Sequence, residues 1–216
     1  MKFYKKYMAM RCVYCQKNVG DQHGLCQGCL GKIEAYDGNG QLDKMESDDG
    51  KGGVLNVKIF AGMYYKGMAK NLIIGMKYKQ WFWAIPVVSG MMSAQLRKED
   101  MEGFEVVAMP MHYRRMWQRG FNQAALLAKE VSRSLSSPMN QRCLIRKKNA
   151  KIQQVLKKAE RFENMKGAFG VQGRIPKKIL LVDDVMTTGA TIKEACCTLI
   201  KNGVEEIIIL VGAKAG

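Results

Sequence analysis

One stretch decides the fold of this chain: Lys178-Ile-Leu-Leu-Val-Asp183-Asp184-Val-Met-Thr187-Thr188-Gly189-Ala190-Thr191. Four apolar residues lead directly into two carboxylates, and a loop of threonine and glycine follows them. The apolar run predicts a buried strand, and the spacing of Thr191 and Glu194 predicts a helix that starts with a capping box. Strand, loop and helix in this order are typical of α/β proteins, which bind ligands beyond the carboxyl ends of their strands.

The same stretch has the chemistry of a site for a sugar phosphate. Backbone N–H groups at the helix start, together with the threonine hydroxyls, can receive a phosphate. The two aspartates can accept hydrogen bonds from the vicinal hydroxyls of a ribose. The alternative is a surface loop with solvated aspartates, which the apolar run ahead of them disfavours. The predicted binding residues are Asp183, Asp184, Thr187, Thr188, Gly189, Ala190 and Thr191.

The rest of the chain from residue 54 onward alternates apolar runs with segments of helical length, which predicts a parallel sheet with helices on its faces. The predicted strands are Val54–Ala61, Phe104–Met109, Ile179–Val182 and Glu206–Val211. The predicted helices are Gly67–Lys77, Ile85–Arg97, Phe121–Ser134 and Thr191–Lys201. We therefore expect an α/β fold.

Four cysteines near the amino terminus form two CxxC pairs: Cys12, Cys15, Cys26 and Cys29. Two such pairs can present four thiolates tetrahedrally to one structural zinc ion, with no open position for catalysis. Two disulfides are the alternative, and His23 could replace one thiolate. A module of this size has too little core of its own, so the metal would supply its folding energy.

Composition suggests where the chain divides. Residues 36–53 are rich in glycine, aspartate and serine, which is typical of a linker or an exposed loop. We therefore predict a zinc-binding module over residues 1–35, a linker or loop over 36–53 and an α/β domain over 54–216.

The chain has 216 residues and a formal net charge of +16, which predicts attraction to nucleic acid, phosphorylated metabolites or an anionic surface. The alternative is that the lysines only keep the protein solvated. The charge is segregated, however: the charged residues within 34–50 are mainly acidic, and those within 142–178 are mainly basic. No apolar run approaches the ~18 residues of a membrane span, and the amino terminus lacks the apolar core of a signal peptide. We expect a cytoplasmic protein without stable membrane insertion.

Several segments in order complete a resemblance to a known family. Ile179–Thr191 resembles the phosphoribosyl-pyrophosphate (PRPP) binding motif of type I phosphoribosyltransferases. The segment 106–123, which contains His112 and Arg-Gly-Phe-Asn-Gln, resembles the strand, loop and helix of the ComF family. Arg146 and the residues after it resemble the long loop of the same family, and the double CxxC resembles its zinc module. The resemblance implies a type I phosphoribosyltransferase fold with a small amino-terminal zinc module.

The basic segments have their own physical interpretation. Arg115 and Arg119 follow a predicted strand, where a bound pyrophosphate would need cationic donors. The alternative is a basic turn whose arginines are simply solvated. In a working transferase these arginines would assist pyrophosphate departure, Asp183 and Asp184 would orient the ribose, and Mg²⁺ would neutralise the leaving group. Trp81, Phe82 and Trp83 could stack on nucleic-acid bases. The alternative is that they belong to the core, as three such aromatic residues in an α/β domain more often do. Nucleic-acid phosphates could contact a lysine-rich surface made of Lys147, Lys148, Lys151, Lys157 and Lys158.

Three functions remain open from the sequence. The resemblance implies a competence protein that binds incoming single-stranded DNA in natural transformation, with PRPP and other DNA-uptake or recombination proteins as partners. A phosphoribosyltransferase is the second hypothesis, although no segment identifies its acceptor. A non-catalytic PRPP sensor is the third, because one fold serves many functions.

Overall fold

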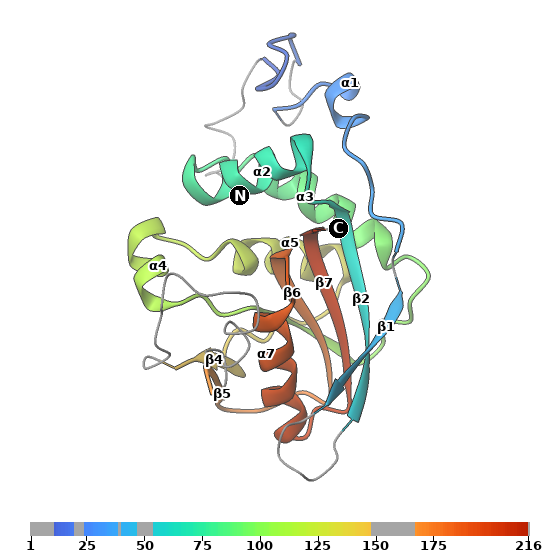
Figure 1. Cartoon of the computed structure of the whole chain (residues 1–216), viewed down its shortest axis with the longest axis vertical. Helices are drawn as coiled ribbons and strands as arrows, with labels where there is room; N and C mark the ends of the chain where they lie inside the picture. Colours follow the sequence, from blue (N-terminus) through green and yellow to red (C-terminus); the bar gives the residue numbers. More distant parts are fainter. Residues whose placement is uncertain (1–10, 20–23, 39, 47–53, 148–166, 216) are drawn as a thin grey trace.

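The computed structural model describes residues 11–19, 24–38, 40–46, 54–147 and 167–215. A five-stranded sheet has the strand order β1-β2-β7-β6-β3 and is covered by helices on both faces (Figure 1). Four of its strands run parallel, and β1 pairs antiparallel with β2 at one edge. The predicted α/β fold with a parallel sheet is confirmed.

The elements are bounded as follows. The sheet consists of β1 (Gln41–Glu46), β2 (Val54–Tyr64), β3 (Phe104–Ala108), β6 (Lys178–Met186) and β7 (Glu206–Lys214), and a separate hairpin consists of β4 (Leu144–Arg146) and β5 (Phe169–Val171). The helices are α1 (Gln27–Leu30), α2 (Gly67–Tyr78), α3 (Ala84–Gln95), α4 (Tyr113–Arg119), α5 (Gln123–Leu135) and α7 (Ala190–Lys201).

Alternating side chains of the central strands build two cores, one on each face of the sheet. On β7, Ile208 and Leu210 pack on the side of α2, α3 and α5, whereas Ile207 and Ile209 pack on the side of α7. Both faces of these strands are apolar because helices cover both sides, as is usual in parallel sheets. Because β3, β6 and β7 run parallel, their carboxyl ends lie together at one end of the sheet.

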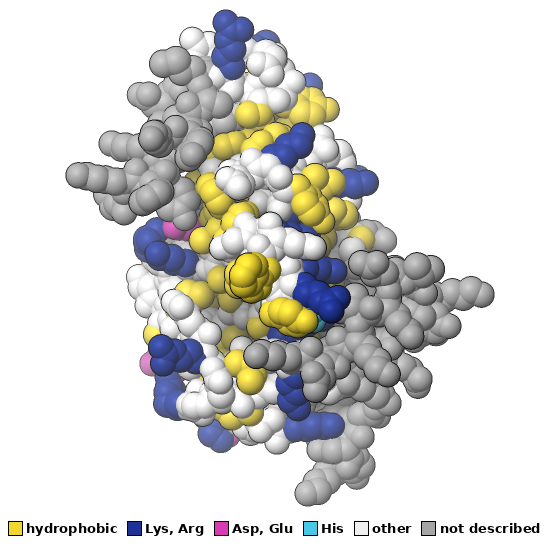
Figure 2. Space-filling model, turned by 90° about the vertical axis from the view of Figure 1, so that its left-hand side faces the viewer, with side chains coloured by type: hydrophobic (Ala, Val, Ile, Leu, Met, Phe, Trp, Pro, Cys, Tyr) yellow, Lys and Arg dark blue, Asp and Glu magenta, His cyan; other side chains and the backbone are white. Residues whose placement is uncertain are grey.

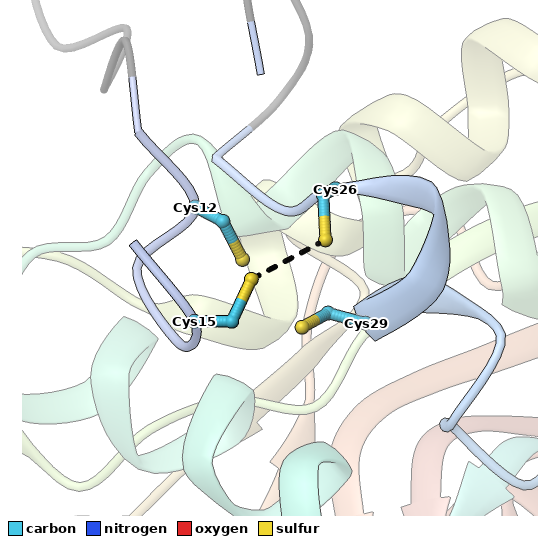
Figure 3. A group of neighbouring side chains, drawn as sticks. All are labelled: Cys12, Cys15, Cys26 and Cys29. Atoms are coloured by element: carbon cyan, nitrogen blue, oxygen red, sulfur yellow. Dashed lines mark hydrogen bonds between the residues drawn. The ribbon is translucent and has the colours of Figure 1, made fainter. Parts of the chain in front are cut away.

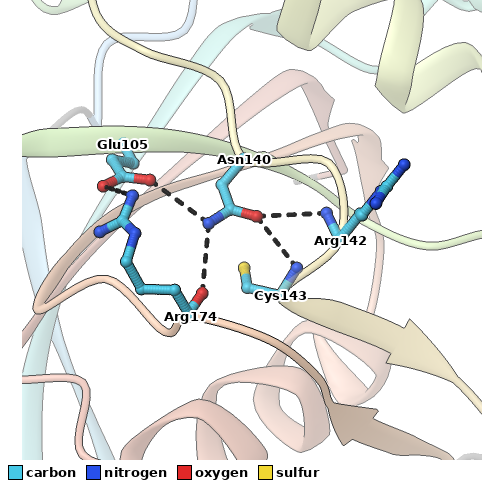
Figure 4. Close-up of polar contacts among 5 residues, drawn as sticks. All are labelled: Glu105, Asn140, Arg142, Cys143 and Arg174. Carbon is cyan, nitrogen blue, oxygen red and sulfur yellow. Dashed lines mark hydrogen bonds and ion pairs between the residues drawn. The ribbon is translucent and has the colours of Figure 1, made fainter.

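Asparagine side chains fix segments at both ends of β3. At the start of α5, Asn122 accepts a hydrogen bond from Ala124 N at 3.1 Å and donates one to Met109 O at 3.0 Å. Figure 4 shows a second asparagine, Asn140, whose amide donates to Glu105 and to the Arg174 carbonyl at 3.3 Å each. Its carbonyl accepts from the backbone of Arg142 and Cys143, so the segment that enters β4 is tied to β3.

The amino-terminal cysteine module packs directly on the domain. Leu25 and Ile33 belong to the same buried cluster as Trp83 and the apolar residues of α2 and α3. Farther along, the Tyr64 backbone N–H donates to the Glu34 carbonyl at 3.1 Å, beside the edge of β2. The module and the sheet are thus joined by packing and by backbone hydrogen bonds.

The prediction of a linker over residues 36–53 was wrong for Gln41–Glu46, which form the edge strand β1. The segment lacks an apolar run, so its sequence does not indicate a strand, whereas its backbone pairs with that of β2. The division into residues 1–35, 36–53 and 54–216 otherwise stays a prediction. Among the described residues, no helix has the length and apolar character needed to cross a membrane.

Candidate sugar-phosphate site and cysteine cluster

The two predicted carboxylates lie near the end of β6 and on opposite sides of the sheet. The strand continues through both residues to Met186, so successive side chains point to opposite faces. Asp184 is buried on the face of α2, and Asp183 lies on the face of α7 and is partly exposed. The Asp183 carboxylate accepts a hydrogen bond from Asp184 N at 2.8 Å, which fixes its orientation.

A lysine at the end of α2 neutralises the buried carboxylate. Lys77 Nζ lies 3.0 Å from Asp184 Oδ1, and the two side chains are only 16% and 10% exposed. An ion pair so shielded from water is held in one geometry, unlike most surface pairs. The pair fixes the last turn of α2 against the carboxyl end of β6.

Asp183 has an unusual protonation equilibrium. Burial, followed by the negative charge of Asp184, raises the pKa of Asp183 to about 7. The Asp184 backbone N–H, Lys77 and Arg146 act in the opposite direction. This carboxyl group can therefore gain or lose a proton near neutral pH.

The loop after β6 leads into α7 through a glycine in the left-handed backbone conformation, which residues with a Cβ rarely adopt. Gly189 has φ 74° and is the N-cap of α7, which begins at Ala190. The first backbone N–H groups of α7 have no partner within the helix, so they suit an anion. Thr187 is exposed, whereas Thr188 and Thr191 are partly buried beside the helix start.

The predicted capping box was wrong. Thr191 lies within the first turn of α7, and no side chain caps the helix. Glu194 Oε1 instead accepts a hydrogen bond from Gly167 N at 2.6 Å. Glu194 thus holds the segment that enters β5 and leaves the start of α7 open.

The two predicted arginines lie on α4, a helix that the sequence does not predict. Arg115 is exposed on the first turns of α4. Arg119 is held in place: it donates to Gln123 Oε1 at 3.1 Å and to the Tyr78 hydroxyl at 3.0 Å. Its guanidinium carbon also lies 4.8 Å from the centre of the Tyr78 ring, a cation–π contact. Tyr78 and Lys77 are consecutive, so the end of α2 contacts both Arg119 and Asp184.

Two residues of this region were not recognised as site residues from the sequence. His112 is 4% exposed and accepts a hydrogen bond from Arg114 N at 3.2 Å as the N-cap of α4. Burial, then the charges of Arg146, Arg114 and Arg115, lowers its pKa, so the ring stays neutral. Arg146 lies over the Phe169 ring at 5.3 Å and interacts electrostatically with Asp183. The sequence shows His112 next to two arginines, but nothing in it indicates burial.

The aromatic residues predicted as possible stacking partners belong to the core, and one of the five predicted nucleic-acid-binding lysines lies in the described residues. Trp83 is buried, and Trp81 and Phe82 pack against the same core, so these rings are structural. Lys147 is exposed directly after β4. The other four lysines predicted to contact nucleic acid lie outside the described residues: Lys148, Lys151, Lys157 and Lys158.

The four predicted zinc ligands come together. Figure 3 shows the sulfur atoms of Cys12, Cys15, Cys26 and Cys29 pointing toward one another, and all lie within 4.8 Å of each other. A tetrahedron with Zn–S bonds of ~2.3 Å needs S···S distances of about 3.8 Å, which is close to the 3.5 Å between Cys15 and Cys26. The cluster therefore fits a four-thiolate zinc site. His23 lies outside the described residues.

The thiols of this cluster differ in acidity. Burial raises the pKa of Cys12, but backbone N–H groups near Cys15, Cys26 and Tyr14 outweigh it and lower this pKa to about 6. Burial and the neighbouring cysteines raise the pKa of Cys29 to about 12. A metal that binds all four thiolates must therefore displace a proton from Cys29.

Comparisons with known proteins agree with this architecture. Residues 122–216 match the family "Phosphoribosyl transferase domain". The chain is similar to Competence protein F of Haemophilus influenzae, with 29% identity over 93% of this chain and 95% of that protein. It is also similar to DNA utilization protein YhgH of Escherichia coli K12, with 38% identity over 45% of this chain and 44% of that protein. Competence protein ComFC of Streptococcus pneumoniae is 28% identical over 66% of this chain and 62% of that protein.

The similarity to Competence protein F includes nearly the whole chain, and the family match includes β6, the loop after it and α7. The four-cysteine cluster lies at the amino-terminal end of the same chain. On these grounds the chain is similar to Competence protein F over nearly its whole length, matches a phosphoribosyl transferase domain over residues 122–216, and has an amino-terminal four-cysteine module that could hold zinc.

Proposed function

We propose that this protein acts in DNA uptake during natural transformation by binding single-stranded DNA in the cytoplasm, and that its phosphoribosyltransferase domain binds PRPP together with Mg²⁺. The similarity to competence and DNA utilization proteins supports the first part. A net charge of +16 supports binding to a polyanion.

The succession of Asp183, Asp184 and the start of α7 carries the second part. The carboxylates lie at the end of β6, and the unpaired N–H groups of α7 follow after the Gly189 turn. A ribose can contact the carboxylates while its 5′-phosphate contacts the helix start. Arg115 and Arg119 on α4 are the cations proposed to contact the pyrophosphate.

A magnesium ion fits this donor set, because carboxylate and phosphate oxygens are its preferred ligands. When bound, Mg²⁺ would neutralise charge on the pyrophosphate. The chain's own residues orient the sugar through Asp183 and Asp184 and hold its phosphate at residues 187–191. The four thiolates would hold zinc in a structural role, since they leave no position for a substrate.

A titration of labelled single-stranded DNA tests both parts together. Fluorescence anisotropy is measured at 50 and 200 mM salt, with and without Mg²⁺ and PRPP, for the wild type and the double variant Asp183→Asn/Asp184→Asn. We expect affinity to fall about 10³-fold or more between the two salt concentrations if six or more phosphates are contacted. PRPP should change the affinity of the wild type and leave that of the double variant unchanged.

The variant Asp100→Asn serves as the control, because Asp100 is exposed in the turn before β3, at the other end of the sheet. It should respond to PRPP as the wild type does. No binding of DNA at 50 mM salt would refute the DNA-binding part. An equal PRPP response in the wild type and the double variant would refute the assignment of the sugar-phosphate site.

A second function, transfer of phosphoribosyl from PRPP to an unidentified small acceptor, is favoured by Asp183. Its pKa of about 7 suits a group that takes a proton from an acceptor near neutral pH. Pyrophosphate release in the presence of PRPP and candidate acceptors would identify this activity. Loss of that release in Asp183→Asn, with PRPP still bound, would assign the proton transfer to Asp183.

A further inference from the structure

The α4 helix exposes an unusual set of side chains. None of its residues is buried, and Trp117 is 87% exposed, Tyr113 46% and Met116 39%. Arg114 and Arg115 are exposed beside them. We call these five residues the α4 platform: Tyr113, Arg114, Arg115, Met116 and Trp117.

Large apolar groups clustered on a surface usually mark a binding site, whereas single exposed ones are ordinary. Three of the five large hydrophobic residues that are exposed in the described part of the chain lie in the α4 platform. A fourth, Tyr78, contacts Arg119 at the end of the same helix. Figure 2, which looks onto the side that carries α4, shows hydrophobic side chains in the middle of this face with lysines and arginines around them.

The charge of this region selects the kind of partner. No acidic residue occurs between Glu105 and Glu130, while α4 alone contains three arginines. A second copy of the chain would carry the same +16 charge and would be repelled. An anionic partner with flat apolar surfaces satisfies both the arginines and the exposed rings, and nucleic acid has both properties.

The spacing of the rings favours a single strand over a duplex. Tyr113 and Trp117 are four residues apart, so they share one side of α4 and are separated by about 6 Å along its axis. Stacked bases repeat every ~3.4 Å, and in a duplex their faces are covered by neighbouring bases. Bases that stack on both rings must therefore be separated from each other, as an unpaired strand allows.

We propose that the α4 platform is a stacking site for single-stranded DNA, with bases on Trp117 and Tyr113 and phosphates at Arg114 and Arg115. The inference rests on the proposed function and adds the surface and the mode of contact. The guanidinium of Arg114 already lies 6.0 Å from the centre of the Tyr113 ring and donates to its hydroxyl. Cation and ring are thus presented together on one turn of helix.

The test uses the full chain and a fluorescein-labelled oligo(dT) of 20 nucleotides. Trp117→Ala should weaken binding about 5- to 100-fold and leave the salt dependence unchanged, because stacking releases no counterions. Trp117→Phe should restore most of the affinity. Arg115→Gln should weaken binding and reduce the salt slope by about 1. Gln118→Ala, exposed on the same helix, is the matched control and should bind as the wild type does.

A second readout reports the contact itself. Unlabelled oligo(dT) should quench tryptophan fluorescence in the wild type, and the quenching should be lost in Trp117→Phe, since Trp81 and Trp83 pack into the core. A duplex of the same length should not quench. Persistent quenching, or equal oligo(dT) affinity in Trp117→Ala, would overturn the inference while the proposed DNA binding stands.

Two other occupants give distinct results. A second copy would appear as a wild-type dimer in light scattering that Trp117→Ala converts to a monomer, with unchanged affinity for oligo(dT). An anionic lipid surface would appear as Trp117-dependent binding to phosphatidylserine vesicles without Trp117-dependent DNA binding. Either result overturns the inference, and failure of the wild type to bind any oligo(dT) at 50 mM salt overturns it together with the proposed DNA binding.

Discussion

Two neighbouring carboxylates on β6 have different environments although the sequence presents them as a matched pair. Asp184 lies in the core beside Lys77, whose positive charge compensates its own. Asp183, on the opposite face, has its pKa raised by burial and by the charge of Asp184. One carboxylate is thus paired with a lysine, and the other has a pKa of about 7 and exchanges its proton near neutral pH.

The raised pKa of Asp183 predicts how the stability of the unliganded protein depends on pH. Between pH 3.8, the ordinary pKa of the carboxyl group, and about pH 7, Asp183 binds more protons in the folded state than in the unfolded state. The stability therefore falls as the pH rises through this range. Asp183→Asn removes this penalty. We expect it to raise the free energy of unfolding by about 1–3 kcal/mol at pH 8 and much less at pH 4. Urea unfolding at both pH values measures this, and an equal effect at both would contradict the raised pKa.

At the scale of elements, the end of α2 is shaped by a close contact between a glycine and a tryptophan. A Cβ added to Gly75 would lie 2.0 Å from Cε3 of Trp81, so the ring would have to move. A Cβ added to Gly90, which is exposed on α3, would have no atom within 4 Å. Two glycines in neighbouring helices therefore have opposite tolerance for a methyl group.

Alanine substitution at the two glycines should have opposite effects. We expect Gly75→Ala to lower the free energy of unfolding by about 1–3 kcal/mol, because overpacking outweighs the gain in helix propensity. Gly90→Ala should raise it by about 0.5–1 kcal/mol. Urea unfolding of both variants measures the difference. A stabilised Gly75→Ala protein would mean that Trp81 moves without cost.

Apolar runs and helical periodicity were enough to predict the central strands and the helices that cover them. The same signals could not predict α4 or β1. The α4 helix buries no residue and so has no apolar stripe, and β1 depends on the backbone of β2 for its partners. The pairing of Lys77 with Asp184 was also not predictable, because it depends on how α2 packs on the sheet. The cysteine spacing did predict the cluster, since four ligands in two short turns leave little freedom.

At the scale of the whole molecule, the cysteine module and the domain share one core. Cys12 and Cys29 belong to the buried cluster that contains Trp83 and the apolar side of α2. A loss of order in the module would therefore expose apolar surface of the domain. The metal that the cysteines could hold would stabilise more than its own loops.

Loss of that metal should consequently affect the entire chain. We expect Cys12→Ser to lower the zinc content below one ion per chain and to lower Tm by about 5–10 °C. Metal analysis and calorimetry measure both, and Trp83 fluorescence should shift as the ring becomes solvated. Cys197→Ser, buried on α7, should keep its zinc and is the control. A variant at Cys12 that retains one zinc would require a different set of ligands.

Lys77 and Tyr78, consecutive residues at the end of α2, contact two separate parts of the site, Asp184 on β6 and Arg119 on α4. If a ligand that draws Asp184 away from Lys77 also moved the last turn of α2, it would change the contact of Tyr78 with Arg119. Binding at the β6 carboxylates and binding at α4 would then be thermodynamically linked, with a coupling free energy that is the same in both directions. A ligand on α4 would in that case change the affinity of the β6 carboxylates by the factor by which their own ligand changes the affinity of α4.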